Sequence, residues 1–390
     1  MDNVRVGVIG FGNMGSAHAK HIFDGLIKGF TLTAVCDIDE NRREKAKIAF
    51  PGVNVFENHT ELLASGTTDA IIIATPHYFH CPIAIDAFNA GQHVLTEKPA
   101  GVYTKQIKEM NSAAEKSGKV FVVMFNQRTN MLFKKAHDLV QSGELGEIKR
   151  MVWIITNWYR TQHYYDSGAW RATWSGEGGG VLLNQAPHNL DLWQWICGRP
   201  QRIRGFCSVA KYHNIEVEDD ATIYAEYENG ATGIFITSTG EAPGTNRLEI
   251  GGTKGKLVIE NGKLTLCKLK VDERDFCFEC QENSSAIPSE TVVIEQTEKE
   301  TAHKGILQNF ANAILHGEEL ISPGFDGINE VEISNAAYLS SWQDRWVELP
   351  VDEDLYYEEL KKRADSSSLK TTGNDNHADM KYSERWSVKW

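Results

Sequence analysis

Long apolar runs are missing from this 390-residue chain, and none of its segments approaches the roughly 20 apolar residues that a membrane-spanning helix needs. The first five residues lead straight into a strand pattern, without the features of a secretory leader. Basic residues are outnumbered, with 40 Lys and Arg against 53 Asp and Glu and a formal net charge of −13. Because nucleic acids and anionic membranes bind clustered positive charge, we expect neither as a partner.

Cysteine is scarce too, since the chain has only seven, an odd number. Cys277 and Cys280 form a single CxxC, and no second pair or histidine stands at the spacing of zinc ligands. Most of the other cysteines sit in strand or helix patterns, as small buried apolar residues do. We therefore expect no metal site, reduced thiols and a cytoplasmic location.

The remaining composition is that of a soluble globular protein, with 41% hydrophobic and 24% charged residues. The length exceeds that of one core, so we expect domains at residues 1–125 and 126–350 and a partly disordered tail at 351–390. In the first domain, apolar strand patterns alternate with helical patterns, which predicts a parallel, doubly wound sheet. The strand patterns lie at residues 4–9, 31–36, 54–56, 70–74, 93–95 and 120–124, and helical patterns at 40–49, 60–65, 80–90 and 103–117.

A glycine motif follows the first strand. Gly10, Gly12 and Gly15 form GxGxxG between an apolar strand and a helical pattern, which is the context that dinucleotide binding requires. Gly10 permits the tight turn, Gly12 lets the backbone approach a pyrophosphate, and Gly15 allows the helix to pack closely on the strand. The free N–H groups of the helix N-terminus would then bind the phosphates. The other residues of this predicted cofactor turn are Phe11, Asn13 and Met14.

Asp37 ends the second strand, at about the distance past the last glycine that is expected for a ribose-binding acid. Its carboxylate would accept hydrogen bonds from the adenosine ribose and repel a 2′-phosphate, which favours NAD over NADP. Arg42 and Arg43 lie close in sequence, so NADP remains open as the less favoured cofactor. The alternative for Asp37 is a turn residue at the end of a strand.

A lysine follows the fifth strand, in the sequence Thr96-Glu97-Lys98-Pro99. Proline biases the residue before it toward extended backbone, and the carboxyl ends of strands in such sheets face the ligand crevice. Most lysines are solvated surface residues, but the glycine motif upstream favours a functional role for Lys98. The other residues predicted to contact the cofactor are Thr75, Pro76, His80, Glu97 and Gln127.

The pattern changes near residue 126 to strands that alternate apolar and polar residues, separated by turn signals such as Asn229-Gly230. This predicts an α+β domain with a large, open, mostly antiparallel sheet that is covered on one face. Sheets of this kind often pair, so we expect a homodimer or homotetramer through the sheet. The predicted strands are 148–158, 203–212, 220–227, 231–239, 245–251, 255–259 and 263–269, with helices near 130–142, 302–316 and 327–341.

The segment from Trp158 to Gly198 combines aromatic and polar residues. Aromatic rings stack on the C–H faces of sugars, while neighbouring polar groups bind the hydroxyls, so this segment is typical of a sugar pocket. A subunit interface or a small separate core is the alternative. The residues selected here as substrate contacts are Tyr159, Tyr165, Trp170 and Arg171.

A triglycine at residues 178–180 precedes Asn184, His188 and Asp191. Their spacing of i, i+4 and i+7 would place all three side chains on one face of a helix, although Pro187 would kink that helix or start a new one. A single histidine on a helix is more often structural. The polar stripe of Asn184, His188 and Asp191 between apolar faces instead favours a functional site.

Taken together, the glycine motif, Glu97-Lys98-Pro99 and the glycine-rich turn before His188-x-x-Asp191 resemble the signatures of the glucose–fructose oxidoreductase/inositol dehydrogenase (Gfo/Idh/MocA) family. The resemblance extends from residue 4 to about residue 346. It implies a Rossmann domain followed by an α/β domain with an open, mostly antiparallel sheet. Inositol dehydrogenase members of the family use a Lys, an Asp and a His four residues later. Lys98 and His188 match these positions, whereas Asn184 occupies the position of the Asp.

The resemblance implies an NAD-dependent dehydrogenase that oxidises a secondary hydroxyl of a sugar, glycoside or cyclitol. Its catalytic residues would be Lys98, which stabilises the developing alkoxide, and His188, which accepts the hydroxyl proton. Asn184 and Asp191 are selected as substrate contacts; Asp191 would either orient His188 or only support the helix. Two alternatives stay open: an NAD-dependent enzyme that cleaves glycosides through transient oxidation and elimination, and a regulator that binds the dinucleotide without chemistry. Asn184 would suit a regulator, because an amide cannot hold a charged imidazole as a carboxylate does. Retention of Lys98 and His188 argues for an enzyme.

Overall fold

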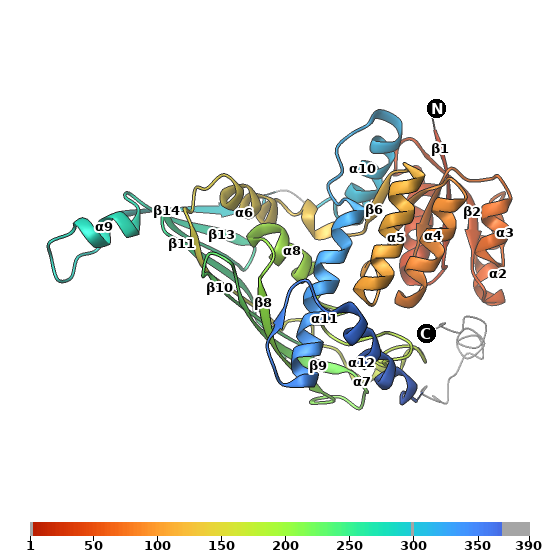
Figure 1. The fold of residues 1–390 in the computed structure, drawn as a ribbon. Coiled ribbons are helices and arrows are strands. Elements are labelled where there is room, and N and C mark those ends of the chain that lie inside the picture. The colour runs from red at the N-terminus through yellow and green to blue at the C-terminus, as the bar shows by residue number, and fades with distance from the viewer. Residues whose placement is uncertain (1–2, 298–299, 369–390) are drawn as a thin grey trace.

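Two sheets with different topologies organise the protein, which we describe from a computed structural model of residues 3–297 and 300–368 (Figure 1). The first sheet has the order β3-β2-β1-β4-β5-β6, and every neighbouring pair is parallel. This confirms the predicted doubly wound sheet. Its strands are β1 (Val4–Ile9), β2 (Phe30–Cys36), β3 (Asn54–Phe56), β4 (Ala70–Ile73), β5 (His93–Thr96) and β6 (Phe121–Val123).

The register of the first sheet brings four strand ends to one edge. Ile9 at the end of β1 pairs with Cys36 in β2 and with Ile73 in β4, and Ile73 pairs with Thr96 in β5. The segments that follow these residues therefore emerge side by side. Helices that cover the sheet are α1 (Asn13–Phe23), α2 (Glu40–Ala49), α3 (His59–Ala64), α4 (His80–Asn89) and α5 (Thr104–Ser117), with the short 3-10 helix η1 (His77–Phe79) before α4.

A helix from late in the chain also packs on the first sheet. In α10 (Ala302–His316), Ile306, Leu307 and Phe310 are buried in the same core as Val4 and Val6 of β1. The chain thus returns to the first domain after the second sheet. This differs from the division expected from sequence, which assigned residues 302–316 to the second domain, because an amphipathic pattern does not reveal which sheet covers it.

The second sheet has nine strands in the order β14-β13-β12-β11-β7-β10-β9-β8-β15. Among the described strands, β7 and β10 are the one parallel pair, so the sheet is mostly antiparallel, as predicted. The strands are β7 (Ile148–Ile155), β8 (Arg202–Val209), β9 (Glu218–Glu226), β10 (Thr232–Ser238), β11 (Asn246–Gly252), β12 (Gly255–Glu260), β13 (Lys263–Leu269), β14 (Ser289–Glu295) and β15 (Val347–Glu348).

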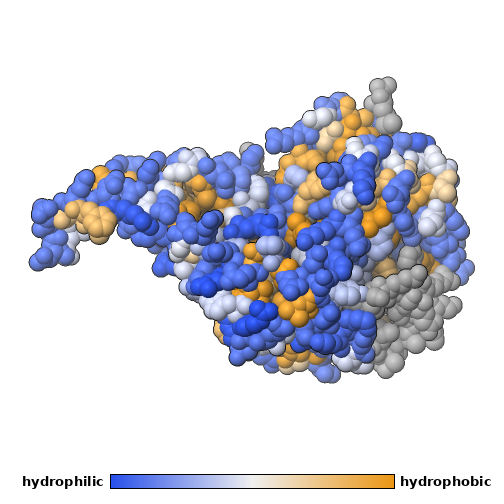
Figure 2. All heavy atoms as spheres, in the orientation of Figure 1, coloured by the Kyte–Doolittle hydropathy of each residue, from blue (hydrophilic) through white to orange (hydrophobic). Residues whose placement is uncertain are grey.

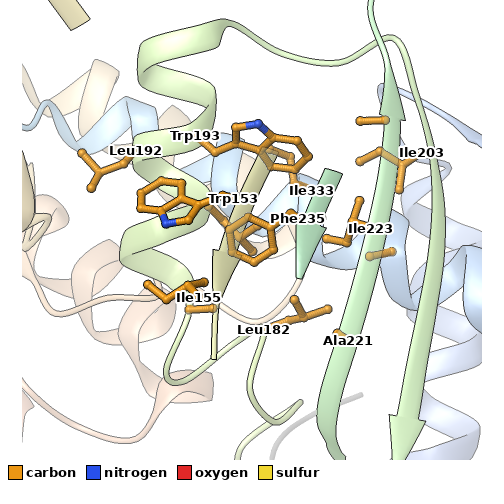
Figure 3. Close-up of a cluster of buried hydrophobic side chains, with 14 of the residues drawn as sticks. Trp153, Ile155, Leu182, Leu192, Trp193, Ile203, Ala221, Ile223, Phe235 and Ile333 are labelled. Atoms are coloured by element: carbon orange, nitrogen blue, oxygen red, sulfur yellow. The ribbon is translucent and has the colours of Figure 1, made fainter. Parts of the chain in front are cut away.

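One face of the second sheet packs against helices and forms the larger core. The Trp193 ring of α8 stacks on Phe235 of β10 with ring centroids 5.4 Å apart, and Trp153 of β7 lies beside them (Figure 3). This packing fixes the position of α8, on which part of the candidate site depends. The helices of this domain are α6 (Met131–Gln141), α7 (Gln162–Asp166), α8 (Pro187–Cys197), α9 (Glu273–Glu279), α11 (Gly327–Gln343) and α12 (Glu353–Asp365), with 3-10 helices η2 (Asn126–Thr129) and η3 (Gly324–Asp326).

The start of the tail at residues 351–390, which we expected to be partly disordered, is helical. Helix α12 begins after Asp352, whose side chain accepts a hydrogen bond from the Leu355 N–H, and it buries Tyr356, Leu360 and Ala364 in the larger core. The sequence did not suggest this helix, because its apolar residues are few and spaced among charges. The rest of the expected tail, from residue 369, lies outside the described residues.

The molecular surface is largely hydrophilic on the face shown in Figure 2, with apolar patches between the polar residues. Helix α9 projects from the far end of the second sheet and leaves the Phe278 side chain 86% exposed (Figure 1). No helix within the described ranges is long and apolar enough to cross a membrane. Among these same residues, no group of three or more His, Cys, Asp or Glu side chains is placed to hold a metal ion.

Candidate functional site

The glycine turn between β1 and α1 is shaped by close backbone contacts. Gly10 has a φ of +91°, and a Cβ there would lie 2.6 Å from the carbonyl oxygen of Ala74. A Cβ on Gly15 would overlap the Gly10 carbonyl oxygen, whereas a Cβ on Gly12 would meet no protein atom within 4 Å. Gly10 and Gly15 are therefore required by the fold, and the space at Gly12 is open for a ligand.

Asp37 lies just past β2 at the same edge of the sheet and is 5% exposed. Its Oδ2 accepts a hydrogen bond of 2.6 Å from the Phe11 N–H, and its Oδ1 accepts one of 2.8 Å from the Asp39 N–H. The Arg42 guanidinium stands 3.7 Å from Oδ2. An ionised carboxylate has about four acceptor sites, so Asp37 can hold the glycine turn and still accept hydrogen bonds from a ribose.

A cleft of about 640 Å³ joins this edge to the loop before α8. It is lined by residues of both domains, so a ligand there would touch the glycine turn and the aromatic segment together. Predicted cofactor residues that line the cleft are Gly10, Phe11, Gly12, Asn13, Met14, Asp37, Thr75, Pro76, His80, Glu97 and Lys98. Predicted substrate residues that line it are Asn184, Trp170 and Arg171.

Several predicted site residues lie elsewhere. Tyr165 is buried in the larger core, where its hydroxyl forms a 2.7 Å hydrogen bond with Thr239, and Tyr159 is half exposed outside the cleft lining. Gln127 lies on η2 and does not line the cleft. The hydroxyl-bearing ring that does line it is Tyr164, one residue from the predicted position. Strand-like alternation does not hold in this loop, so sequence alone could not choose between adjacent tyrosines.

Trp170, Arg171 and Tyr164 form one stacked group on the cleft wall. The Arg171 guanidinium lies 4.5 Å from the Trp170 ring centroid and 4.8 Å from that of Tyr164, and it donates a 3.0 Å hydrogen bond to the Tyr164 hydroxyl. The Trp170 ring meets His77 of η1 edge-on, with centroids 5.7 Å apart. This contact ties the aromatic loop of the second domain to the strand-end segments of the first.

Lys98 extends into the cleft from the segment after β5. Its Nζ donates a 2.8 Å hydrogen bond to the backbone carbonyl of Asn184. Burial lowers the pKa of Lys98, and the charges of Glu97, Glu330 and Glu177 act against that change. The link between Lys98 and Asn184 joins two segments that are 86 residues apart in the chain.

Glu97, the residue before Lys98, bonds to the first helix. Its Oε1 forms a 2.7 Å hydrogen bond with His18 Nε2 of α1, and both side chains are almost fully buried. Burial acts to raise the pKa of Glu97, but the hydrogen bond and charge of His18, together with His303 and Lys98, lower it to about 2. Glu97 is thus an ionised anchor between β5 and the helix that follows the glycine turn.

A carboxylate that the sequence analysis did not select stands next to Asn184. Glu177 is 2% exposed; one of its carboxyl oxygens accepts a hydrogen bond from the Asn184 side chain, and the other accepts one of 2.5 Å from the Ala172 N–H. Burial raises the pKa of Glu177, against the charge of Arg171 and these hydrogen bonds. In the sequence, the position of Glu177 directly before the triglycine could have identified it, because a glycine-rich turn brings the adjacent residues close to other backbone.

The triglycine is held by a second buried acid, Glu218 of β9. The Glu218 carboxylate accepts hydrogen bonds of 2.9 Å from the N–H groups of Gly180 and Leu182 and one of 2.7 Å from the Tyr338 hydroxyl. Burial raises the pKa of Glu218 to about 7 despite these donors. The turn that carries Asn184 is therefore held by a carboxyl group whose pKa is close to neutral pH.

His188 and Asn184 do not share a helix, because α8 begins at Pro187. Asn184 lies in the preceding turn, and His188 in the first turn of α8, half buried and outside the cleft lining. Burial, followed by the charge of Lys98, lowers the pKa of His188 well below its usual value. The imidazole is therefore neutral at pH 7, and its Nδ1 is buried with no hydrogen-bond partner among the described residues.

Asp191 has a structural partner. Its carboxylate accepts hydrogen bonds of 2.6 and 2.8 Å from the buried Arg128 guanidinium, which also donates one of 2.7 Å to Asp326. Of the two roles considered for Asp191, this geometry favours support of α8. A substrate contact has no support here, since Asp191 is fully buried and outside the cleft lining.

The donors and spaces at the glycine turn fit a dinucleotide. The N-cap position of α1 is Gly12, with no side chain to satisfy the first N–H groups of the helix. These donors, with the open space at Gly12 and the acid at Asp37, match the pyrophosphate and ribose of such a cofactor.

Comparisons with known proteins agree with this geometry. The sequence model described as the oxidoreductase family with an NAD-binding Rossmann fold matches residues 4–125, and that of the GFO/IDH/MocA C-terminal domain matches residues 133–258. The two matched regions together span well over half of the chain.

Similar proteins include several dehydrogenases. The myo-inositol 2-dehydrogenase of Thermotoga maritima is 25% identical over 70% of this chain and 80% of its own. The levoglucosan dehydrogenase of Pseudarthrobacter phenanthrenivorans is 27% identical over 90% of this chain and 99% of its own. The crystal structure of the WlbA dehydrogenase from Bordetella pertussis with NADH and UDP-GlcNAcA superposes with a TM-score of 0.75 at 25% identity, covering 90% of this chain and 100% of that one.

Proposed function

Because the chain belongs to the Gfo/Idh/MocA family and is an NAD-binding oxidoreductase, we propose that it oxidises a secondary hydroxyl of a sugar, glycoside or cyclitol to a ketone. The observation that carries the proposal is the hydrogen bond from Lys98 to Asn184 inside the cleft that the glycine turn also lines. The relatives named for inositol and levoglucosan support the substrate class.

NAD, when bound, supplies the acceptor for the hydride that leaves the carbinol carbon. The chain would hold it with the N–H groups at the start of α1, with the open backbone at Gly12 and with Asp37 on the adenosine ribose. The fixed carboxylate of Asp37 disfavours a 2′-phosphate, which supports NAD over NADP.

Lys98 would stabilise the substrate oxygen. An ammonium has three donors, and the hydrogen bond to Asn184 fixes its direction while leaving others for a ligand. As the alcohol loses its proton, negative charge develops on the oxygen, and a preorganised cation nearby stabilises that charge at no reorganisation cost. The half-buried position of Lys98 strengthens this interaction, because the effective dielectric there is lower than in water.

His188 would accept the hydroxyl proton. A general base must be unprotonated before the reaction, and the lowered pKa of His188 keeps the imidazole neutral at physiological pH. The charge of Lys98 contributes to this lowering, which is consistent with the two side chains acting at one substrate oxygen. His188 does not itself line the cleft, and His188→Ala tests its access to a substrate.

Asn184 and Glu177 would act together where other family members have an Asp. The Asn184 side chain donates to the buried Glu177 carboxylate, while its backbone carbonyl holds Lys98. Asn184 thus connects the Glu177 carboxylate, through its side chain, to the Lys98 ammonium, through its backbone carbonyl. Trp170, Arg171 and Tyr164 would contact the substrate, since they line the same cleft.

The second sheet would mediate self-association into a homodimer or homotetramer. Its uncovered face and its edge strand β14, where Val292 and Val293 are about half exposed, present apolar surface that a second copy would bury. Light scattering of the purified protein would measure the assembly, and a strictly monomeric protein would remove this part of the proposal.

Activity is tested by incubating the purified protein with NAD and a panel of polyols, including myo-inositol, free hexoses and levoglucosan, and following NADH absorbance. We expect NADH formation with at least one of them. His188→Ala should then lower kcat at least a hundredfold, within the 10²–10⁴ range of general base catalysis, with NAD binding retained. His316→Ala, at the exposed C-terminal end of α10, is the matched control and should leave kcat unchanged.

Other outcomes would redirect the proposal. Unchanged turnover in His188→Ala would remove His188 from the mechanism. Release of an aglycone from aryl glycosides without accumulation of NADH would replace net oxidation by redox-assisted glycoside cleavage. An inactive protein that still binds NAD would contradict the proposed substrate class.

A further inference from the structure

A fully buried glutamate, Glu330, lies in the first turn of α11 and is 0% exposed. Among the described residues, neither of its carboxyl oxygens has a hydrogen-bond partner. The helix N-terminus favours negative charge, but it supplies no partner for these oxygens here. Burial of unpartnered polar atoms costs stability, so a carboxyl group kept in this state requires a reason.

Helix α11 lies along the segment that follows the active-site lysine. A Cβ on Gly327, at the start of the helix, would stand 2.5 Å from Ala100, and Asn335 two turns later donates a 3.0 Å hydrogen bond to the Val102 carbonyl. Glu330 lies between these two anchor points, on the same side of the helix as Gly327. The lysine segment and the glutamate are therefore held against each other by contacts on both sides.

Among the buried charges near Glu330 in the described part of the chain, Lys98 is a cation with hydrogen-bond donors that remain free. Arg128 already bonds both Asp191 and Asp326 at 2.6–2.8 Å, so its charge is shared between two carboxylates. Among the described residues, Lys98 Nζ has one hydrogen bond, to a backbone carbonyl, although an ammonium has three donors. The cation thus has unused donors and the glutamate has unused acceptors.

Burial favours the neutral forms of Glu330 and Lys98, whereas the charge of each group favours the charged form of the other. Burial and the negative charge of Asp191 raise the pKa of Glu330 well above its usual value, and Lys98 opposes the change. Conversely, the charge of Glu330 opposes the lowering of the Lys98 pKa by burial. The other charged or titratable groups that interact with Lys98 are Glu97, Glu177, Arg171, His77, His80, His188 and His303.

We propose that Glu330 is a positioning residue of the active site, whose carboxylate pairs with the Lys98 ammonium across one buried water and keeps the lysine protonated. The pairing of the two side chains does not depend on the proposed function. Only its consequence for catalysis rests on the proposed function, in which the protonated lysine stabilises the substrate oxygen.

The pairing is tested without substrate or cofactor, by measuring how the labelling rate of Lys98 with an amine-reactive reagent depends on pH, using mass spectrometry. Removal of the Glu330 charge in Glu330→Gln should move the titration of Lys98 to lower pH by about one unit, at the low end of the effect of a nearby opposite charge. Glu332→Gln is the matched control on the same helix, because Glu332 is also buried but pairs with Arg199. A titration of Lys98 in Glu330→Gln that superimposes on the wild type would overturn the proposal.

A second substitution at Glu330 separates a positioning role from a structural one. In Glu330→Met the carboxyl group is replaced by an apolar group of similar size, so a positioning role predicts that the Lys98 titration shifts as it does in Glu330→Gln, whatever the change in Tm. A fall in Tm with an unchanged Lys98 titration would assign Glu330 to the fold and overturn the proposal.

The catalytic consequence has its own readout. In Glu330→Gln the alkaline limb of the kcat/KM profile should move to lower pH, because Lys98 loses its proton earlier, while Glu332→Gln keeps the wild-type profile. If the wild type oxidises no polyol but the labelling shift is present, the proposed function fails and the pairing stands. An unshifted alkaline limb in active Glu330→Gln would overturn the claim that Glu330 keeps the lysine protonated during turnover.

Discussion

The two walls of the cleft are built by different means. The wall at the glycine turn is set by close backbone contacts at Gly10 and Gly15, which leave no room for a side chain, and by the hydrogen bond from the Phe11 N–H to Asp37. The opposite wall, around Lys98 and Asn184, is assembled from distant segments and held by buried acids, among them Glu177 and Glu218. Steric constraints do not depend on pH, whereas a wall that rests on carboxyl groups does.

The difference also assigns separate tasks to the walls. Backbone N–H groups and an open glycine suit a cofactor that every turnover uses in the same way. Side chains with shifted pKa values suit proton transfer and charge stabilisation, which must match the particular substrate. Substitutions in one wall should therefore affect cofactor binding or folding, and substitutions in the other should affect kcat and its pH dependence.

The largest effect is expected from Lys98→Met. Loss of a preorganised cation at the substrate oxygen should lower kcat by about 10²–10³, the size found for removal of one oxyanion-stabilising donor, while NAD affinity remains close to wild type. Steady-state kinetics on the best polyol and NAD titration by fluorescence measure the two quantities.

Lys45→Met is the matched control for that experiment, since Lys45 lines the same cleft at the adenosine end and should affect kcat little. A Lys98→Met variant that loses NAD affinity instead of kcat would place the lysine in the cofactor wall and break the comparison.

The contrast between the walls also explains what the sequence could predict. The glycine turn is local: Gly10, Gly12 and Gly15 lie within six residues, and the strand before and helix after them are visible as patterns. Asp37 follows the next strand, and the parallel register brings it to the same edge by rule. The first sheet, and the position of the candidate cofactor residues at its edge, were therefore predictable from periodicity, without knowledge of the rest of the chain.

The second wall was predictable only in part. The spacing of Asn184, His188 and Asp191 suggested one helix, but Pro187 starts α8 and separates Asn184 from the other two. Glu177 and Glu330 escaped notice, because their partners or their lack of partners depend on segments far away in sequence. Burial of a charged residue is a property of the assembled fold, and the pattern of apolar and polar residues within one segment does not reveal it.

Glu218→Gln should reveal the pH sensitivity of the second wall. The folded-state pKa of Glu218 is raised to about 7 from a usual value near 4.5, so the folded state binds the proton more tightly than the unfolded state does. The stability that this proton contributes is complete below about pH 4.5 and is lost as pH rises to about 7, by roughly 3 kcal/mol.

Glutamine does not titrate, so the stability of the variant does not change with pH through this residue. The difference in unfolding free energy between Glu218→Gln and wild type, from urea titrations at several pH values, should thus change by that amount in favour of the variant between pH 4.5 and 7. A constant offset, expected because the amide N–H₂ meets a backbone N–H donor, does not affect the slope. Parallel pH profiles would mean that Glu218 does not titrate in this range.

Gly15→Ala tests whether the first wall is set by sterics. A Cβ at this position would overlap the Gly10 carbonyl oxygen, and forcing extra atoms into packed structure typically costs about 1–3 kcal/mol. Thermal unfolding should show a lower Tm at every pH, with no dependence on the ionisation of the acids in the second wall. A variant as stable as the wild type would mean that α1 shifts easily, and the close-contact account of this turn would not hold.

The smallest effect belongs to Gly12→Ala, the matched partner of that substitution. A Cβ there would meet no protein atom within 4 Å, so the unfolding free energy should stay within about 0.5 kcal/mol of wild type, as for most surface changes. The added methyl group would instead occupy the space where the cofactor approaches the backbone, and NAD affinity should fall about tenfold, equivalent to about 1.4 kcal/mol. Calorimetric titration with NAD measures this directly. If Gly12→Ala destabilised the fold and bound NAD normally, the turn would be a structural element alone, and the cofactor would have to contact the cleft elsewhere.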